Sequence, residues 1–450
     1  MVRQIRLNAF FMNCVVHQSP GLWRHPRDRT QDYTDISYWV DLARTLERGR
    51  FDALFLADVL GVYDVYCGGA EAALRGAVQV PVNDPVLLVP VLAYATRHLG
   101  FGVTSILSYD QPYAFARRMS TLDHLTKGRV GWNVVTGYLD SAARAAGRSR
   151  QDGHDLRYEI ADDYMEAVYK LWEGSWEDGA VIRDREAGVF ADPARVHRIR
   201  HEGRHFQLDG YHLSEPSPQR TPVLFQAGSS PRGRAFAARH AECVFIAGNS
   251  TAEIRRLVGE IRERAAAAGR DPQAITVFLS AVCVPGRTRG EAQDKLADYR
   301  RYGSVEGSLV LQSGWQGVDF AAAPLDTPIA ALGRGSVEAH DRSDRPPDRR
   351  TIRELGEAAT LGGGAPLLTG SAADVADEMQ RWVEEADIDG FNLTSVVAPE
   401  SYVDFVDIVV PELQRRGVHK QDYRAGTLRE KLGGEARLPP SHPGARHRAG

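Results

Sequence analysis

Cysteine is scarce in this sequence, and long hydrophobic runs are absent. The 450 residues contain four cysteines with no CxxC pair among them, at Cys14, Cys67, Cys243 and Cys283. Scattered thiols of this kind argue against a disulfide framework and favour a reduced, cytoplasmic setting. No stretch of about eighteen consecutive apolar residues occurs, so we expect no membrane span.

An excess of either charge and a dinucleotide-binding motif are also missing. Lysine plus arginine (55) nearly balance aspartate plus glutamate (59), which leaves a formal net charge of −4. This balance gives no reason to expect nucleic acid as a partner and favours a small ligand. The N-terminal segment is interrupted by Asn8 and Asn13 and has no small-residue cleavage site, so we do not expect export. No GxGxxG follows the first apolar run, which argues against a dinucleotide-binding fold.

Short apolar runs dominate what the sequence does contain. Nearly all are continuous in apolar character, which is typical of strands covered on both faces. Eight such runs occur, beginning at Ile5, Ala53, Phe101, Val130, Val223, Cys243, Ile275 and Phe391. Helical patterns with apolar residues at i, i+3, i+4 and i+7 lie between them, for example at 36–46 and 254–261. The alternation predicts an α/β fold of the (β/α)8 TIM-barrel type rather than an open doubly wound sheet.

Three stretches are too long for ordinary barrel loops. Residues 60–83, 175–221 and 303–370 are predicted to be insertions after strands 2, 4 and 7, so that one barrel domain spans 1–432. The last insertion contains the polar segment RSDRPPDRR and is either a lid over the barrel mouth or a plain disordered loop. Residues 433–450 are expected to form a flexible C-terminal tail.

The segment at 117–137 is the most informative single stretch. It predicts an amphipathic helix that stops at Gly128, followed by a buried strand at 130–135. Asn133 and Thr136 lie where that strand ends. Because parallel barrels build their active sites at the carboxyl ends of the strands, we expect chemistry at these two residues.

One short motif could suggest a metal. His201, Glu202 and His205 match HExxH, which binds zinc when a continuous helix brings both imidazoles to one side. Gly203 lies inside the motif, and the sequence that follows predicts strand and turn. We therefore expect no metal site, which also disfavours a metal-dependent barrel hydrolase.

A candidate phosphate site follows the fifth predicted strand. Gly228, Ser229 and Ser230 there precede Pro231 and a helix. Glycine permits close backbone approach, the hydroxyls donate, and the free N–H groups of the helix start attract an anion. An ordinary serine N-cap before proline would give the same pattern, so both interpretations stay open.

Polar residues also mark the second strand end and one helix start. Asp58 stands where the second apolar run stops and could accept hydrogen bonds or cap a turn. His154 and Tyr158 lie at i and i+4 with Arg157 beside them, so the three could grip an anionic or aromatic ligand. A solvated first turn would show the same residues.

Four more residues could overhang the barrel mouth. Cys14 and His17 follow the first strand, and Tyr63 and Gln79 lie in the insertion after the second. A buried cysteine usually behaves as a small hydrophobe, and a loop histidine is often satisfied by its neighbours. The sequence alone leaves a structural and a functional role open for each.

Several ordered segments resemble the bacterial-luciferase-like flavin monooxygenases, in the branch of nitrilotriacetate, dibenzothiophene-sulfone and long-chain alkane monooxygenases. They are GLWRHP (21–26), FDALFLAD (51–58), STLDHLTKGRVGWNVVTG (120–137), HDLRYEIADDYMEAVYKLWEGSWE (154–177) and PVLFQAGSSPRGRAFAARHAECVF (222–245). NAFFMNCVVH, GVYDVY and AVQVPVNDP are most similar to the long-chain alkane monooxygenases. The resemblance spans most of the chain and implies a TIM barrel that binds FMN.

The resemblance also implies roles for individual residues. Those that would border the flavin are Asp58, Thr104, Asn133, His154 and Tyr158. Those that would hold its phosphate are Ser229 and Ser230. Those that would line the pocket above the ring, candidates for catalysis together with Asn133, are Cys14, His17, Tyr63 and Gln79. His17 or Asn133 would stabilise developing charge as a general acid or hydrogen-bond donor.

The implied activity is the insertion of one oxygen atom from O2 into a small organic substrate, such as an alkane, sulfone, thioether or aminocarboxylate, through a C4a-hydroperoxyflavin. A separate NAD(P)H-dependent flavin reductase would supply reduced FMN, in agreement with the missing dinucleotide motif. A homodimer or homotetramer is implied as well. The alternatives are an F420-type deazaflavin-dependent dehydrogenase, which oxygen dependence would distinguish, and a non-catalytic flavin-binding protein, which the intact polar rim disfavours.

The substrate wall is where the sequence departs from the family pattern. Leu311 stands where the alkane enzymes carry a pocket histidine, and Tyr138 also replaces a histidine. The sequence after Leu311 looks more like that of the sulfone monooxygenases. The resemblance therefore does not identify the substrate as an alkane.

Overall fold

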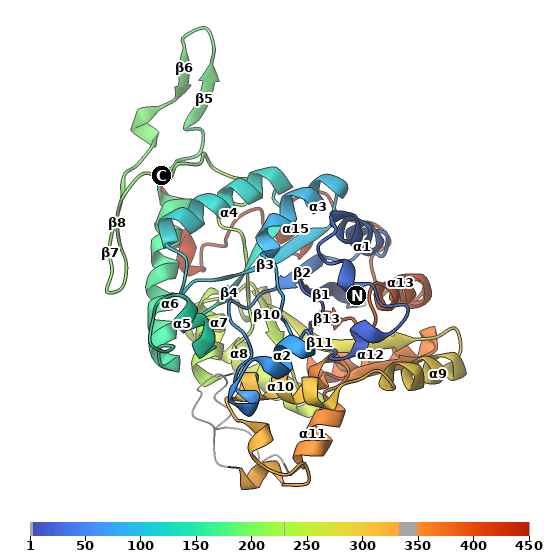
Figure 1. Cartoon of the computed structure of the whole chain (residues 1–450). Coiled ribbons are helices and arrows are strands. Elements are labelled where there is room, and N and C mark those ends of the chain that lie inside the picture. Colours follow the sequence, from blue (N-terminus) through green and yellow to red (C-terminus); the bar gives the residue numbers. More distant parts are fainter. Residues whose placement is uncertain (1–2, 229, 333–348, 450) are drawn as a thin grey trace.

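A closed barrel of eight parallel strands forms the centre of the computed structural model, which describes residues 3–228, 230–332 and 349–449 (Figure 1). The barrel strands, in order around it, are β1 (Arg6–Met12), β2 (Ala53–Ala57), β3 (Gly100–Ile106), β4 (Val130–Val135), β9 (Val223–Gln226), β10 (Cys243–Ile246), β11 (Thr276–Pro285) and β13 (Gly390–Thr394). Parallel pairing of β10 with β11 and of β13 with β1 closes the ring. The predicted (β/α)8 barrel and its eight strands are confirmed.

Helices cover the outside of the barrel. They are α1 (Ile36–Arg48), α3 (Val89–Ala95), α4 (Pro112–Thr126), α6 (His154–Tyr169), α7 (Pro231–His240), α8 (Thr251–Ala267), α9 (Arg289–Arg300) and α12 (Ala372–Ala386), with α13 (Glu400–Asp404), a π-helical segment (Phe405–Val409) and α14 (Val410–Arg415) closing the series. On β1, for example, the side chains of Leu7, Ala9 and Phe11 point outward and pack in the large hydrophobic core that the barrel shares with these helices. Both faces of the strands are therefore buried, which explains their continuous apolar character.

Phenylalanine side chains fill the inside of the barrel. The rings of Phe55 and Phe245 lie 4.2 Å apart between centroids, and Phe225 stacks on Phe245 at 5.6 Å. Gly102 on β3 and Gly131 on β4 lie in register and leave the space that these phenylalanine rings occupy. A Cβ on Gly102 would lie 2.5 Å from Phe55, and one on Gly131 would lie 2.4 Å from Phe225. The barrel is thus a packed core with its open end above this phenylalanine layer.

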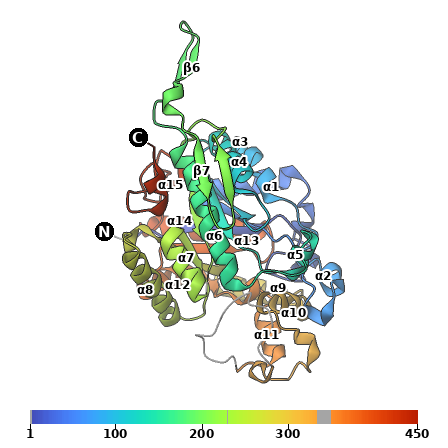
Figure 2. The ribbon, with the colours of Figure 1, turned by 90° about the vertical axis from the view of Figure 1, so that its left-hand side faces the viewer.

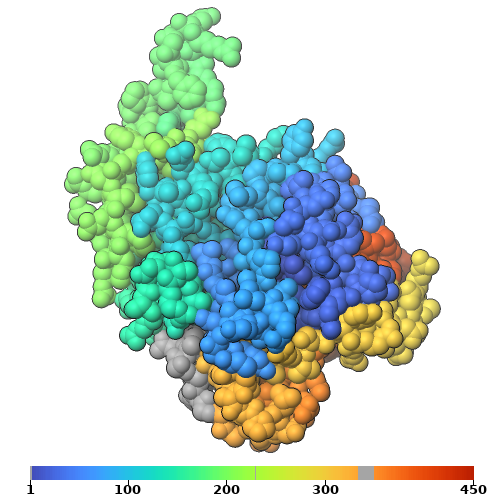
Figure 3. Space-filling model, viewed as in Figure 1, coloured from blue at the N-terminus to red at the C-terminus, as the bar shows by residue number. Residues whose placement is uncertain are grey.

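The three predicted insertions interrupt the barrel where expected. The first contains α2 (Glu71–Arg75), and the third contains α10 (Val305–Gln316), α11 (Ile352–Ala358) and β12 (Leu367–Gly370). The second forms two hairpins, β5 (Val181–Asp184) with β6 (Val189–Ala191) and β7 (Ile199–Glu202) with β8 (Gln207–Gly210). Figures 2 and 3 show the β5–β6 hairpin projecting away from the barrel. Most of RSDRPPDRR falls outside the described residues, so the lid prediction is not tested there.

The C-terminal segment that was predicted to be a flexible tail makes buried contacts with the barrel. Leu438 and His442 are buried, and the His442 imidazole contacts the carbonyl oxygen of His240 at 2.9 Å. Arg448 lies 3.4 Å from the carboxylate of Glu173, which is fully buried. Composition alone did not predict this docking, because the partners of the tail lie far away in the sequence. Among the described helices, none is long and apolar enough to cross a membrane.

Candidate active site

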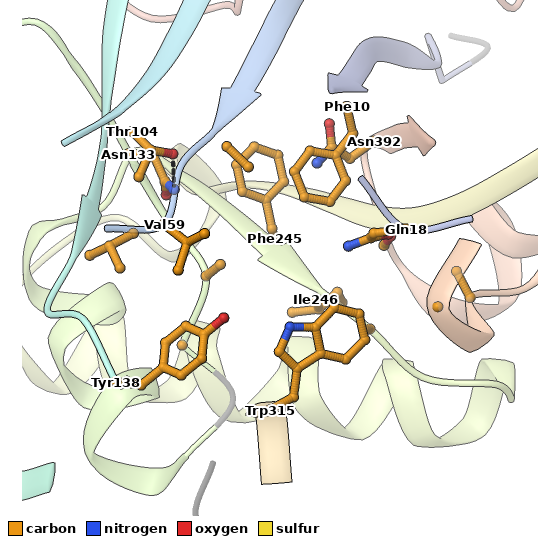
Figure 4. A pocket seen from close by; sticks show the side chains of 18 of the residues that line it. Phe10, Gln18, Val59, Thr104, Asn133, Tyr138, Phe245, Ile246, Trp315 and Asn392 are labelled. Atoms are coloured by element: carbon orange, nitrogen blue, oxygen red, sulfur yellow. Dashed lines mark hydrogen bonds between the residues drawn. The ribbon is translucent and has the colours of Figure 1, made fainter. Parts of the chain in front are cut away.

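A cavity of about 480 Å³ opens at the carboxyl ends of the barrel strands. Its floor is the phenylalanine layer, and its sides come from strand ends and from the first and third insertions (Figure 4). Of the residues proposed from the sequence, those that line it are His17, Asp58, Tyr63, Gln79, Thr104, Asn133, Thr136, His154, Arg157, Tyr158 and Gly228. Residues far apart in the sequence therefore meet at the predicted end of the barrel.

Thr104 and Asn133 form one polar pair at the barrel mouth. They face each other in the register of β3 and β4, and Asn133 Nδ2 donates to Thr104 Oγ1 at 2.9 Å (Figure 4). Asn133 Oδ1 is buried and has no hydrogen-bond partner among the described residues. Because buried polar atoms are normally satisfied, this oxygen is available for a ligand donor.

Asp58 follows β2 and is the one acidic residue among the described residues that line the cavity. Burial raises the pKa of its carboxyl to about 7, and the charge of Asp84 acts in the same direction, while the N–H of Val59 opposes both. The group is therefore close to half protonated at neutral pH. It can serve either as a donor or as an acceptor toward a ligand.

The starts of α6 and α7 form the second end of the cavity. His154 and Tyr158 lie edge to face on α6 with ring centroids 5.2 Å apart. Ser230 Oγ accepts the N–H of Gly233 and so caps α7, with Pro231 in the first turn. The N-cap interpretation of the serine pattern is confirmed for Ser230. Ser229 lies outside the described residues.

The residues after β1 and in the first insertion divide into two groups. His17, Tyr63 and Gln79 line the cavity, and Gln79 connects the other two through its side-chain amide. Cys14 does not line it: the thiol is 1% exposed and donates to the carbonyl of Val16 at 3.1 Å. Burial raises the pKa of Cys14, and the charge of Asp58 adds to this effect, so the thiol stays protonated. Cys14 therefore behaves as a small hydrophobe rather than as a pocket residue.

Comparison with known proteins agrees with this arrangement. The model of the luciferase-like monooxygenase family matches residues 14–389. The chain belongs to that family. It is 49% identical to the dimethyl-sulfide monooxygenase of Hyphomicrobium sulfonivorans over all of this chain and 94% of that protein. It is also 49% identical to the long-chain alkane monooxygenase of Geobacillus thermodenitrificans, over all of this chain and 99% of that protein.

Solved structures of relatives superpose closely on this luciferase-like monooxygenase. The crystal structure of a long-chain alkane monooxygenase has a TM-score of 0.93, with 49% identity and full coverage of both chains. A riboflavin lyase with modified FMN and riboflavin also has a TM-score of 0.93, at 38% identity and full coverage of both chains. The family assignment makes the chain an oxygenase enzyme, as the sequence predicted.

Several residues of the monooxygenase cavity were not identified from the sequence. Ser280 and Asn392 line it from the interior of β11 and β13, and their register pairs them side by side. A polar residue inside an apolar strand was the available signal for both. Trp315 reaches the cavity from α10, and no local pattern marks it as a neighbour of Tyr138, which the sequence had already placed in the substrate wall.

The HExxH match does not form a helical zinc motif in this monooxygenase. His201 and Glu202 lie on β7, where side chains alternate between faces. His201 Nε2 lies 2.8 Å from a carboxylate oxygen of Asp163, which also accepts the N–H of His205. The motif residues hold the β7–β8 hairpin against α6.

Proposed function

We propose that this monooxygenase uses reduced FMN, supplied by a separate flavin reductase, to transfer one oxygen atom from O2 to a small organic substrate. The observation that carries the proposal is the single cavity that runs from the start of α7 to the barrel mouth. One end offers helix N–H groups and the other offers a polar pair above an aromatic floor. This division suits a molecule with an anionic tail and a flat ring.

The residues present fit FMN at both ends. At α7, a Cβ on Gly228 would lie 2.4 Å from Gln226 Nε2, and one on Gly233 would lie 2.7 Å from the Tyr158 hydroxyl. The missing side chains let a phosphate approach the backbone closely at Gly228, whereas the N–H of Gly233 is already accepted by Ser230 Oγ. At the barrel mouth, the unpaired Asn133 Oδ1 faces the region where a ring N–H would satisfy it.

The chain's own residues have distinct tasks in this proposal. Reduced flavin, when bound, supplies the activation of oxygen. Asn133 and Thr104 orient the ring, Asp58 holds or releases a proton beside it, and Ser229 and Ser230 hold the phosphate. The phenylalanine floor and the insertions exclude water from the ring.

His17 is proposed as a neutral hydrogen-bond donor. Burial lowers the pKa of its imidazole to about 3, so the ring is uncharged at neutral pH. A role as general acid would need the charged form, so the donor role is the one that the burial supports. His17→Ala should lower turnover and spare FMN affinity. Unchanged coupling of reduced-flavin consumption to product in that variant would remove His17 from the site.

The phosphate site has its own test. Ser229→Ala combined with Ser230→Ala should raise the dissociation constant for FMN about tenfold, the loss of roughly one charge-assisted hydrogen bond. Ser371→Ala is the matched control, because it removes the serine N-cap of α12 outside the cavity. Equal FMN affinity in the double variant and the control would discard the phosphate assignment.

The activity itself is tested by a substrate screen. The protein is incubated with FMN, a generic flavin reductase, NADH and ¹⁸O2, and alkanes, thioethers, sulfones and aminocarboxylates are offered. We expect a product that carries one labelled oxygen atom and requires both flavin and O2. Product formation without oxygen would indicate a deazaflavin-type dehydrogenase, and flavin binding without any product would indicate a flavin-binding protein.

We also propose a homodimer or homotetramer. Leu87, Val91 and Tyr94 form an exposed apolar stripe at α3, and Tyr94 is 95% exposed. Ile182 and Phe190 are exposed on the projecting β5–β6 hairpin. Apolar surface in two such places is typical of contacts between subunits. Light scattering should give a multiple of 49.6 kDa, and Leu87→Asp with Tyr94→Asp should shift the mass toward one chain.

A further inference from the structure

Positively charged side chains gather at the amino-terminal end of the barrel, opposite the cavity. One of them, Lys431, is the last residue of the short helix α15 (Leu428–Lys431). Leu428 packs with Phe55 and Phe225 inside the barrel and lies against Gly100, the first residue of β3. Lys431 is therefore held at the closed end of the barrel, whereas the cavity opens at the carboxyl ends of the strands.

Three cations at this end surround one aromatic ring. The side chains whose charged groups lie 5.7–5.8 Å from the centre of the Tyr423 ring are Arg50, Lys420 and Lys431. Lys431 Nζ also donates to the carbonyl oxygen of His98 at 2.9 Å, in a hydrogen bond at the surface. The Lys431 amine is thus half-buried and fixed in position, and small solutes can still reach it.

A fourth cation nearby has no counter-ion. Arg129, just before β4, is buried and donates to the carbonyl of Leu99, the residue next to the one that accepts from Lys431. Its remaining hydrogen bonds go to other backbone carbonyls and to a threonine hydroxyl, and none of the described carboxylates pairs with it. A second positive charge on Lys431 is therefore disfavoured.

The other lysines of the chain have different surroundings. Lys127 is exposed at the end of α4 and, like Lys431, forms no ion pair with the described residues. The lysines that pair with a carboxylate are Lys170, Lys295 and Lys420. Lys431 is the lysine that combines partial burial and cationic neighbours with no paired carboxylate among the described residues.

The protonation of Lys431 follows from this geometry. Burial lowers the pKa of its ammonium group from 10.5 to about 8, and the charges of Arg129 and Lys420 act in the same direction, while Glu47 and Asp52 oppose them. A large share of the side chain is therefore free amine at mildly alkaline pH. The titratable side chains around it are Glu47, Arg50, Asp52, His98, Arg129, Lys420 and Tyr423.

We propose that Lys431 is an acylation site, at which small acyl phosphates transfer their acyl group to the side-chain amine. The lone pair of Nζ forms a bond to the acyl carbon, the bond from that carbon to the phosphate oxygen breaks, and inorganic phosphate leaves. The surplus proton on the nitrogen passes to water, and no atom changes its oxidation state. The positive charge around Lys431 attracts the anionic reagent.

Labelling of the full-length protein with acetyl phosphate tests the proposal. Peptide mass spectrometry measures the rate of acetylation at each lysine, and the exposed Lys127 is the matched comparison. At pH 8 about half of an amine with a pKa near 8 is free, against less than about 1% of an ordinary lysine. Because a less basic amine attacks more slowly, we expect a net advantage of about tenfold for Lys431. An equal or lower rate at Lys431 than at Lys127 would overturn the proposal.

Three changes of condition test the proposed cause. The rate at Lys431 should level off above about pH 8, where the amine is fully free. Its advantage over Lys127 should disappear in concentrated urea, because unfolding removes the cationic neighbours. The advantage should also be smaller with the uncharged reagent N-acetoxysuccinimide. A rate that keeps rising with pH, an advantage that survives unfolding, or an equal advantage with the uncharged reagent would contradict the proposed site.

Lys431→Arg identifies the reacting group. Arginine keeps a positive charge and a donor for the His98 carbonyl but removes the nucleophilic amine. The fast phase of total acetyl incorporation should be lost in this variant and kept in the control Lys127→Arg. A fast phase that persists in Lys431→Arg would show that another group reacts, and the proposal would fall. The labelling needs neither flavin nor oxygen, so its outcome is independent of the proposed oxygen transfer.

Discussion

The Asp58 carboxyl should make the stability of the flavin-free protein fall as the pH rises. Its pKa is about 7 in the folded chain, because burial disfavours the charged form, against 3.8 for an ordinary aspartate. Between these two values the folded state binds more protons than the unfolded state. The free energy of unfolding therefore declines from about pH 4 to about pH 7 and stays low above it.

The size of the effect follows from the two pKa values. Their difference corresponds to about 4 kcal/mol at most, at about 1.4 kcal/mol for each tenfold change in the proton equilibrium. Water that reaches the half-buried carboxyl through the cavity reduces this upper limit. Asp58→Asn removes the ionisation, so the variant should match the wild type near pH 4 and exceed its stability at pH 8.

Urea denaturation at several pH values measures this directly. The exposed Asp41 on α1 supplies the control variant Asp41→Asn, which should follow the wild-type curve. An Asp58→Asn curve with the wild-type pH slope, or a variant less stable than the wild type at pH 8, would refute the reasoning.

Three further predictions concern packing, the tail and titration. Gly131→Ala forces a methyl group against the Phe225 ring and should lower the free energy of unfolding by about 1–3 kcal/mol. An unchanged midpoint in urea denaturation would contradict this prediction. Arg448→Ala leaves the buried Glu173 with one partner fewer and should cost about 1–3 kcal/mol in the same titration, and wild-type stability would show that the tail does not anchor there. The pKa of His17 is about 3, so His17→Asn should lower turnover without changing the shape of the pH profile at neutral pH. If the wild type showed a transition in turnover near neutral pH that His17→Asn lacked, the low pKa assigned to His17 would be contradicted.

The barrel could be predicted because its physical cause is local. A strand buried on both faces needs a continuous apolar run, and each of the eight runs became a strand. The strands that the sequence did not predict are short and have no continuous apolar run. Val181–Asp184 is mostly exposed, and Leu367–Gly370 pairs only at the edge of a longer neighbour. The docking of the tail depends on the buried Glu173, which its own composition does not reveal.

The candidate site likewise contains residues that the sequence could place and residues that it could not. Asp58 and Asn133 could be placed because a polar residue at the end of a buried strand must lie at the barrel mouth. Trp315 could not, since its place in the cavity depends on how α10 of the third insertion packs against the first insertion.

The most direct test of the central claim is the location of bound FMN. A crystal structure of the protein grown with FMN should show the phosphate at the start of α7, beside Gly228 and Ser230, and the ring beside Asn133. Density for the flavin outside this cavity, or an empty cavity when the flavin is present far above its dissociation constant, would contradict the account.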